Sequence, residues 1–239
     1  MHLLIFYGAI LPAVVAALIV LPLRFRAKVS PRLLGAAAVA GGFVAAFFAL
    51  GFAEHRPQEG WPWLAITAAL AGGLPMPVAA RFVAWVGVAA FVCYRVIPPG
   101  LFESEDWGPW RVQCYAAIAG GVFFLGVVSS LAKRLTVFVW AIVVASGAGV
   151  LFWADIATFA QMAGALAAGL GAVAIVDRGG TAATGAIAVA AVLHPALLAA
   201  GCFNHFSDVP TWVFAVAGLV PLAGLALTVL PFAKPPGRG

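Results

Sequence analysis

Charged side chains are scarce in this sequence. Of its 239 residues, 13 are Lys or Arg and eight are Asp or Glu, together 9% of the chain, whereas soluble globular domains carry about 25%. So few charges cannot cover the surface of a water-soluble fold. The mean hydropathy of +1.10 also excludes a disordered or fibrous chain. We therefore expect a membrane protein that crosses the bilayer several times.

Several functional signatures are also missing. No long apolar run carries Asp or Glu near its centre, which argues against a transporter that relays protons or sodium through buried carboxylates. The sequence has no paired histidines at haem-ligating separation and no H-E-x-x-H, Cys-x-x-Cys or P-loop motif. We therefore expect no cofactor and no resident metal. The scattered basic residues form no continuous stripe of the kind that binds nucleic acid.

Long apolar segments dominate the chain. A helix needs about 20 apolar residues to cross roughly 30 Å of hydrocarbon, and eight segments reach this length with charges only at or beyond their ends. A ninth candidate, Trp61 to Leu74, has only 14 residues. The expected spans are 3–23, 32–53, 61–74, 78–97, 110–131, 135–154, 156–176, 181–202 and 212–232. They make residues 1–239 a single transmembrane helical domain.

The distribution of charge indicates that the short segment crosses the membrane. If it does, ten of the 13 basic residues fall on one side and seven of the eight acidic residues fall on the other. A re-entrant segment would place Lys133 and Arg134 on the acidic side. Because short cytoplasmic loops are enriched in Lys and Arg, we expect nine crossings with the N-terminus outside and the C-terminus inside. The first segment is followed, not preceded, by basic residues, which favours a retained helix over a signal peptide.

Glycine and alanine recur at short spacing within the spans, for example in 41–46 and 164–171. Membrane helices associate through close backbone approach, because lipid tails are as apolar as leucine side chains. Pro195 and Pro221 lie inside two spans, where each removes a backbone donor and frees a carbonyl. These features are typical of an all-α polytopic membrane protein of the bacterial inner (cytoplasmic) membrane. We predict a bundle of about nine transmembrane helices with a short third helix.

Gln161 and His194 are the most distinctive polar pair in the spans. The turn at 177–180 joins their two helices, and the residues lie 16 positions before it and 14 positions after it. At 1.5 Å rise per residue their depths differ by only about 3 Å. An ionisable group inside a membrane is a candidate functional site, so we consider this pair a candidate binding site. The alternative is a hydrogen bond that only holds two helices together.

A second candidate cluster lies at the outer face, where the sequence contains His205 and Asp208, and where Asp155 falls at the turn between two spans. With His194 these side chains have the chemistry to bind a divalent metal, because imidazole and carboxylate are suitable ligands. Their spacing matches no recognised metal motif. A solvated loop is the alternative interpretation.

Cys93 and Cys114 lie at similar distances from the loop at 98–109, near the outer ends of their helices. Equal depth permits a disulfide but does not show that the two side chains face each other. Two buried free thiols are the alternative.

The same outer loop is the most acidic part of the chain. Glu103, Glu105 and Asp106 lie there, between Arg95 and Arg111. Ion pairs between these acids and the two arginines are one hypothesis, and a solvated loop is the other.

Three hypotheses of function follow. The first is a non-enzymatic permease or membrane subunit that takes a neutral or weakly polar molecule from the extracytoplasmic side. The second is an outer-facing intramembrane enzyme acting on a lipid or lipid-linked substrate, with His194, His205, Asp208 and Asp155 as acid, base or metal ligands. The third is a non-catalytic membrane scaffold. The expected partners are the lipid bilayer, other membrane subunits or a small neutral or lipidic ligand, and no nucleic acid.

Overall fold

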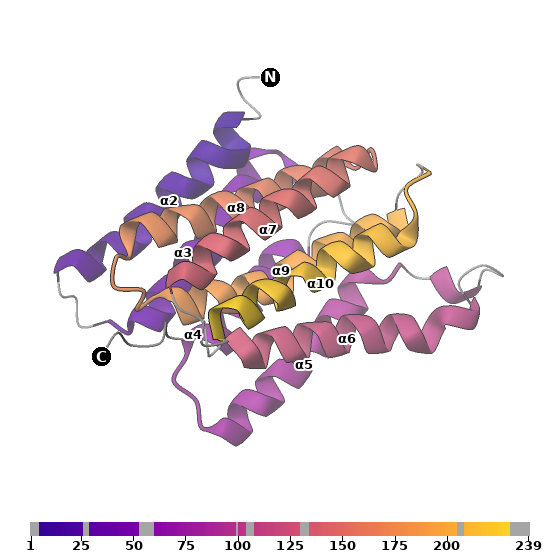
Figure 1. Ribbon diagram of the computed structural model, residues 1–239, viewed down its shortest axis with the longest axis horizontal. Coiled ribbons are helices and arrows are strands. Elements are labelled where there is room, and N and C mark those ends of the chain that lie inside the picture. Colours follow the sequence, from indigo (N-terminus) through magenta and orange to yellow (C-terminus); the bar gives the residue numbers. More distant parts are fainter. Residues whose placement is uncertain are drawn as a thin grey trace, which may run out of the picture.

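The computed structural model of the chain is a bundle of helices (Figure 1). The structure describes residues 5–25, 29–52, 60–98, 100–103, 108–129, 134–204 and 208–229, and no strand occurs within these ranges. The nine α-helices are α2 (Leu11–Val20), α3 (Pro31–Ala49), α4 (Trp61–Gly73), α5 (Val78–Val96), α6 (Arg111–Val128), α7 (Arg134–Trp153), α8 (Ala157–Val176), α9 (Ala183–Asn204) and α10 (Thr211–Val229). Each lies in or close to one of the segments predicted as spans, and the predicted all-helical class is confirmed.

Short helical turns extend some of these elements. A π-helical turn, η1 (Phe6–Ile10), precedes α2 and a 3₁₀ turn, η2 (Leu21–Phe25), follows it. Two further 3₁₀ turns, η5 (Leu101–Glu103) and η6 (Gly108–Trp110), lie between α5 and α6. Within the described residues, and with these turns included, seven helical segments are long and apolar enough to cross a membrane. Such a chain is a multi-pass membrane protein.

The outer surface of the bundle is apolar, as lipid requires. Large hydrophobic side chains are exposed on all sides, and the most exposed include Val78 (82%) and Val112 (76%). A soluble monomer rarely exposes apolar patches of more than a few hundred square ångströms. This apolar surface is compatible with contact to lipid tails.

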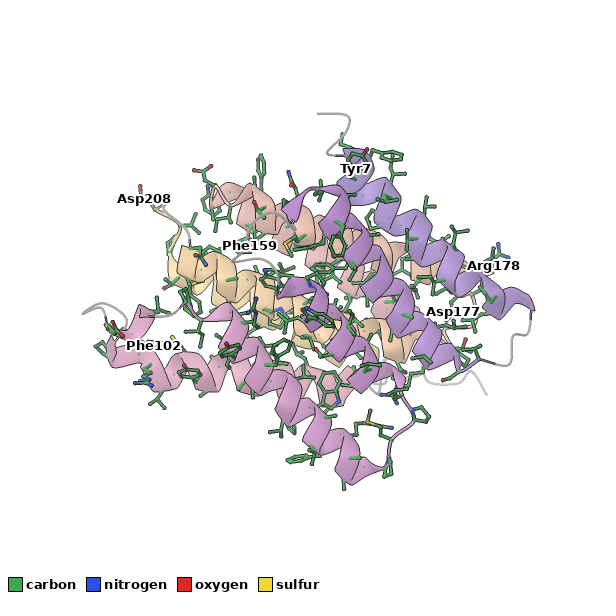
Figure 2. The ribbon with its side chains drawn as sticks, turned by 180° about the vertical axis from the view of Figure 1, so that it is seen from behind. Tyr7, Phe102, Phe159, Asp177, Arg178 and Asp208 are labelled. Carbon is green, nitrogen blue, oxygen red and sulfur yellow. The ribbon has the colours of Figure 1, made fainter. Side chains whose placement is uncertain are left out.

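The two ends of the bundle carry different predicted loops. Figure 2 shows Asp208 and Phe102 toward one end and Asp177 and Arg178 at the other. The segments expected outside and the α8–α9 turn expected inside therefore lie at opposite ends of the molecule.

Helix α9 forms the core of the bundle. It packs against α3, α4, α5, α6, α7, α8 and α10. From Ala186 to Leu193 every residue has an exposed fraction of 0%. Eight consecutive residues cover every face of an α-helix, so α9 is surrounded on all sides.

Glycines allow the close approach of the helices around α9. A Cβ on Gly185 of α9 would overlap the carbonyl oxygen of Arg32, and one on Gly35 of α3 would overlap that of Ala182. A Cβ on Gly72 of α4 would overlap the side chain of Ala188. At each of these positions only hydrogen fits, so the small residues allow the helix backbones to approach closely.

Helix α4 is short. The uncharged stretch of the neighbouring helix α5 has the same number of residues. Gly60, directly before α4, packs against the guanidinium of Arg95. After the C-terminus of α4, the connection to α5 contacts Arg81. Thirteen residues of α4 rise about 20 Å. Between Arg81 and Arg95, α5 likewise has 13 uncharged residues. The two helices thus match each other in apolar length, below the roughly 30 Å of an average bilayer core.

Candidate functional site

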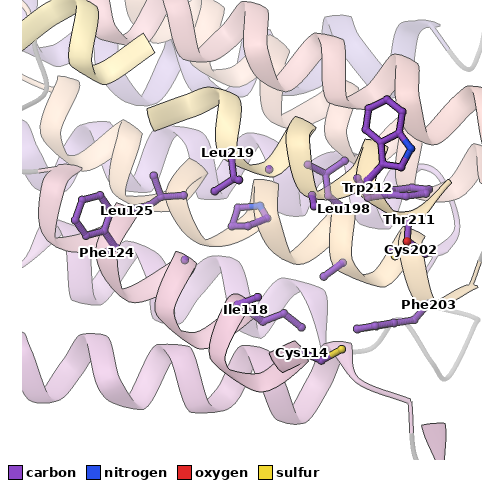
Figure 3. Close-up of a pocket in the computed structure, with 17 residues that line it drawn as sticks. Cys114, Ile118, Phe124, Leu125, Leu198, Cys202, Phe203, Thr211, Trp212 and Leu219 are labelled. Carbon is purple, nitrogen blue, oxygen red and sulfur yellow. The ribbon is translucent and has the colours of Figure 1, made fainter. Parts of the chain in front are cut away.

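The clearest candidate site is a groove between α6 and α10 whose floor is α9 (Figure 3). Its volume is about 410 Å³, within the range of small-molecule sites. The principal lining residues are Cys114, Ile118, Gly121 and Leu125 of α6, Pro195, Leu198 and Cys202 of α9, and Thr211, Trp212, Phe214, Gly218 and Leu219 of α10. We call this cavity the α6–α10 groove.

The α6–α10 groove follows one face of each helix. On α6 the lining positions 114, 118, 121 and 125 recur every three or four residues, which is the spacing of one helical face, and 117 and 124 lie beside them. From Cys114 to Leu125 the helix rises about 16 Å, roughly half the thickness of the hydrocarbon core. The groove therefore reaches from one end of the bundle to about mid-membrane depth.

The groove is almost entirely apolar. Among the described lining residues, the polar side-chain groups are the hydroxyl of Thr211, the indole N–H of Trp212 and the thiols of Cys114 and Cys202, and none is charged. An ion moved into such a space would lose its hydration without gaining a partner. The groove is therefore suited to a neutral molecule that is largely apolar.

His194 lies directly before Pro195 of the groove floor but points to other neighbours. Its exposed fraction is 1%, and its Nε2 lies 3.2 Å from the carbonyl oxygen of Ala217 on α10. This carbonyl lacks its usual helical partner, because Pro221 four residues later has no N–H. A carbonyl oxygen can only accept, so Nε2 carries the hydrogen and donates it.

Gly147 of α7 provides the space for the His194 ring. A Cβ at position 147 would lie 2.6 Å from Cε1 and 3.3 Å from Nδ1 of His194. Both distances are shorter than ordinary van der Waals contact, so the imidazole lies flush against the backbone of α7. His194 is thereby held between α7 and α10.

Gln161, the predicted partner of His194, is half-buried on α8. It lies one turn before Gly164, whose nearest neighbour beyond its own helix is the backbone of Gly8 in η1. Within the described part of the chain, Gln161 and His194 form no hydrogen bond with each other, and His194 bonds to Ala217 instead. A joint role of the two in binding stays a prediction.

The structure describes two members of the predicted outer cluster, Asp155 and Asp208, and both are exposed. Asp155 has φ of 59° in the turn between α7 and α8, a left-handed conformation that Asp tolerates better than most residues. His205 lies outside the described residues. Among the residues that are described, no group of three His, Cys, Asp or Glu side chains is arranged to hold a metal.

The three cysteines are free thiols. Cys93 is buried against the backbone of Ala119 on α6, whereas Cys114 lies more than one turn away on that helix and lines the α6–α10 groove. The two side chains thus face different neighbours, and the structure contains no Cys93–Cys114 disulfide. Cys114 and Cys202 instead share the groove.

The structure describes only some of the residues in the predicted outer ion pairs. Glu103, Arg95 and Arg111 are all exposed, and no ion pair joins them in the described structure. Glu105 and Asp106 lie outside the described residues, so their pairing with the arginines stays a prediction.

The α6–α10 groove was not predicted from the sequence. A weak signal exists in the small residues Ala117 and Gly121 of α6 and Gly218 of α10, which leave space where larger side chains would fill it. The sequence does not show that these residues face one another. Compared with protein-family models, curated proteins and solved structures, the chain matches none.

Proposed function

We propose that this protein is a non-enzymatic permease or membrane subunit of a bacterial inner membrane, which binds a neutral or weakly polar molecule in the α6–α10 groove. The molecule enters from the extracytoplasmic side. The observation that carries the proposal is the groove itself, an uncharged cavity of about 410 Å³ between two membrane helices.

The position of the groove supports entry from the outer side. Cys114, Phe203 and Thr211 line it near the start of α6, the end of α9 and the start of α10. The distribution of charge predicts that these three helix ends face outward. A molecule with a polar end and an apolar body would place the polar end near the Thr211 hydroxyl and the body along Ile118 and Leu125.

Two adjacent alanines of α6 allow a matched test. Ala116 and Ala117 are both exposed, and of the two only Ala117 lines the groove. Ala117→Phe would fill the groove, whereas Ala116→Phe adds the same side chain to the neighbouring surface. The protein, reconstituted in lipid nanodiscs, is photolabelled with a neutral long-chain alcohol that carries a diazirine, and the labelled peptides are identified by mass spectrometry.

We expect saturable labelling concentrated on the groove faces of α6, α9 and α10. Ala117→Phe should weaken it roughly tenfold, which corresponds to about 1.4 kcal/mol of lost binding, and Ala116→Phe should leave it unchanged. Labelling spread over all lipid-facing helices, or equal labelling of both variants, would contradict the proposal.

A further inference from the structure

Two arginines from different helices lie near each other at the end of the bundle opposite the entrance of the α6–α10 groove. Arg32 of α3 donates a hydrogen bond from Nε to the carbonyl of Gly72. Arg81 of α5 donates from Nη2 to the carbonyl of Met76 at 3.2 Å. Arg32 therefore binds the last turn of α4, and Arg81 binds the connection that follows it. The positive charges of the two arginines repel each other.

The charge of this arginine pair is not neutralised by the described part of the chain. No Asp or Glu described in the structure forms an ion pair with either residue. Asp177, a carboxylate from the same end of the bundle, accepts hydrogen bonds from the Ala182 N–H at 2.6 Å and the Thr181 hydroxyl at 3.3 Å. It is thus occupied by the turn that precedes α9.

Arg81 also has a buried donor without a partner. Its Nε is shielded from solvent and forms no hydrogen bond. Leaving a buried donor unpaired is unfavourable, and more so when the group is charged. A hydrogen bond to a backbone carbonyl satisfies one donor of each arginine. It does not satisfy the Arg81 Nε–H, and it does not offset the repulsion between the two guanidinium groups. An anion between the two guanidinium groups would resolve both.

An apolar cavity begins beside the arginine pair. It has a volume of about 300 Å³ and lies between α4 and α5, lined among others by Thr67, Leu70, Met76, Gly87, Val88 and Phe91. Met76, whose carbonyl binds Arg81, forms its end nearest the arginines. We call this cavity the α4–α5 groove. A cationic end and an apolar groove thus lie next to each other on the lipid-facing side of α5.

We propose that this region binds one anionic phospholipid, with its phosphate at Arg32 and Arg81 and an acyl chain in the α4–α5 groove. Arginine presents a planar fork of donors that fits phosphate oxygens. The arginine pair also lies at the end of the bundle where the basic loops are expected, which is the cytoplasmic side. The cytoplasmic leaflet is the one that carries anionic lipids. The site is separate from the α6–α10 groove and does not depend on the function proposed for it.

The test uses one variant for each half of the site. Arg81→Gln removes the charge, and Gly87→Leu fills the apolar groove, where an added Cβ meets no atom within 4 Å. The matched controls are Arg178→Gln, an exposed arginine at the same end of the bundle, and Gly120→Leu, a glycine of α6 with equally open space. Native mass spectrometry counts lipids retained from micelles with equal phosphatidylglycerol and phosphatidylcholine, with and without added inorganic phosphate.

We expect the unaltered protein to retain one phosphatidylglycerol molecule in about tenfold preference to phosphatidylcholine, the ratio for about 1.4 kcal/mol. Arg81→Gln should abolish the preference, and Gly87→Leu should reduce retention of both lipids. The two controls should behave like the unaltered protein, and inorganic phosphate should not compete.

Three results would overturn the proposal. Equal retention of the two lipids by the unaltered protein would show that the headgroup charge is not recognised. Unchanged retention in both test variants would place the bound lipid elsewhere. Displacement by inorganic phosphate, together with an unaffected Gly87→Leu variant, would indicate a soluble-anion site in place of a lipid site.

Discussion

At the scale of single residues, a proline in one helix accounts for the hydrogen bond of a buried histidine in another. Pro221 leaves the Ala217 carbonyl of α10 without its helical donor, and His194 of α9 supplies one. The sequence predicts that His194 lies within a span and that Pro221 frees a carbonyl. It does not predict that the two meet, because spacing along one helix says nothing about which neighbouring helix it faces.

The coupling between His194 and Pro221 can be measured with a double-mutant cycle. We expect His194→Ala to lower the free energy of unfolding by about 2 kcal/mol, through the lost hydrogen bond and the cavity left behind. In a Pro221→Ala background, α10 can satisfy its own carbonyl, so the loss should fall to about 1 kcal/mol. Reversible unfolding in mixed micelles measures both values. Equal losses in the two backgrounds would show that the two residues are not coupled.

Two glycines of α7 allow a test of how the His194 ring packs against this helix. An added Cβ on Gly147 would overlap the His194 ring and force it to shift, whereas one on Gly149 meets nothing within 4 Å. We expect Gly147→Ala to lower the free energy of unfolding by about 2 kcal/mol and Gly149→Ala to change it by less than about 0.5 kcal/mol. Thermal denaturation of the two variants in the same detergent provides the comparison. Similar melting temperatures would contradict the packing described for His194.

At the scale of elements, the positions of the helices are predictable and their burial is not. Long apolar runs reveal each span because hydrocarbon excludes charge. The mean hydropathy of α9 is no higher than that of α7, yet α9 is far more buried. In lipid, the outward and inward faces of a helix are equally apolar, so the periodicity that marks the buried face in soluble proteins is lost. The central place of α9 therefore had to come from the structure.

The contact between α3 and α9 depends on glycine. Gly185 faces the backbone carbonyl of Arg32, which cannot move aside as a flexible side chain would. We expect Gly185→Ala to separate the two helices and to cost about 3 kcal/mol or more. Gly171→Ala on α8 is the control, because its Cβ would meet open space; it should be neutral or slightly stabilising.

The yield of folded protein and its unfolding free energy in mixed micelles distinguish the two variants. If Gly185→Ala were as stable as Gly171→Ala, this would contradict the close contact described between α3 and α9.

At the scale of the whole molecule, the account depends on how many times the chain crosses the membrane. The scarcity of charge predicts a membrane protein, and the sidedness of those few charges predicts nine crossings. The structure has a helix in each predicted span, but α4 is too short to cross an average bilayer by its length alone. Its match to the 13 uncharged residues between Arg81 and Arg95 of α5 favours a crossing through a thinner region. The α6–α10 groove, in contrast, depends on how three helices are spaced, which no single segment of sequence encodes.

The most direct test is the labelling of single cysteines on either side of α4. In a background with Cys93, Cys114 and Cys202 replaced by alanine, Gln58→Cys and Pro75→Cys flank this helix, and Ser130→Cys reports the segment between α6 and α7. Nine crossings predict that a membrane-impermeant maleimide labels Gln58→Cys in intact cells, and labels Pro75→Cys and Ser130→Cys only after permeabilisation. Labelling of Pro75→Cys and Ser130→Cys in intact cells would contradict the account, because α4 would then not cross the membrane.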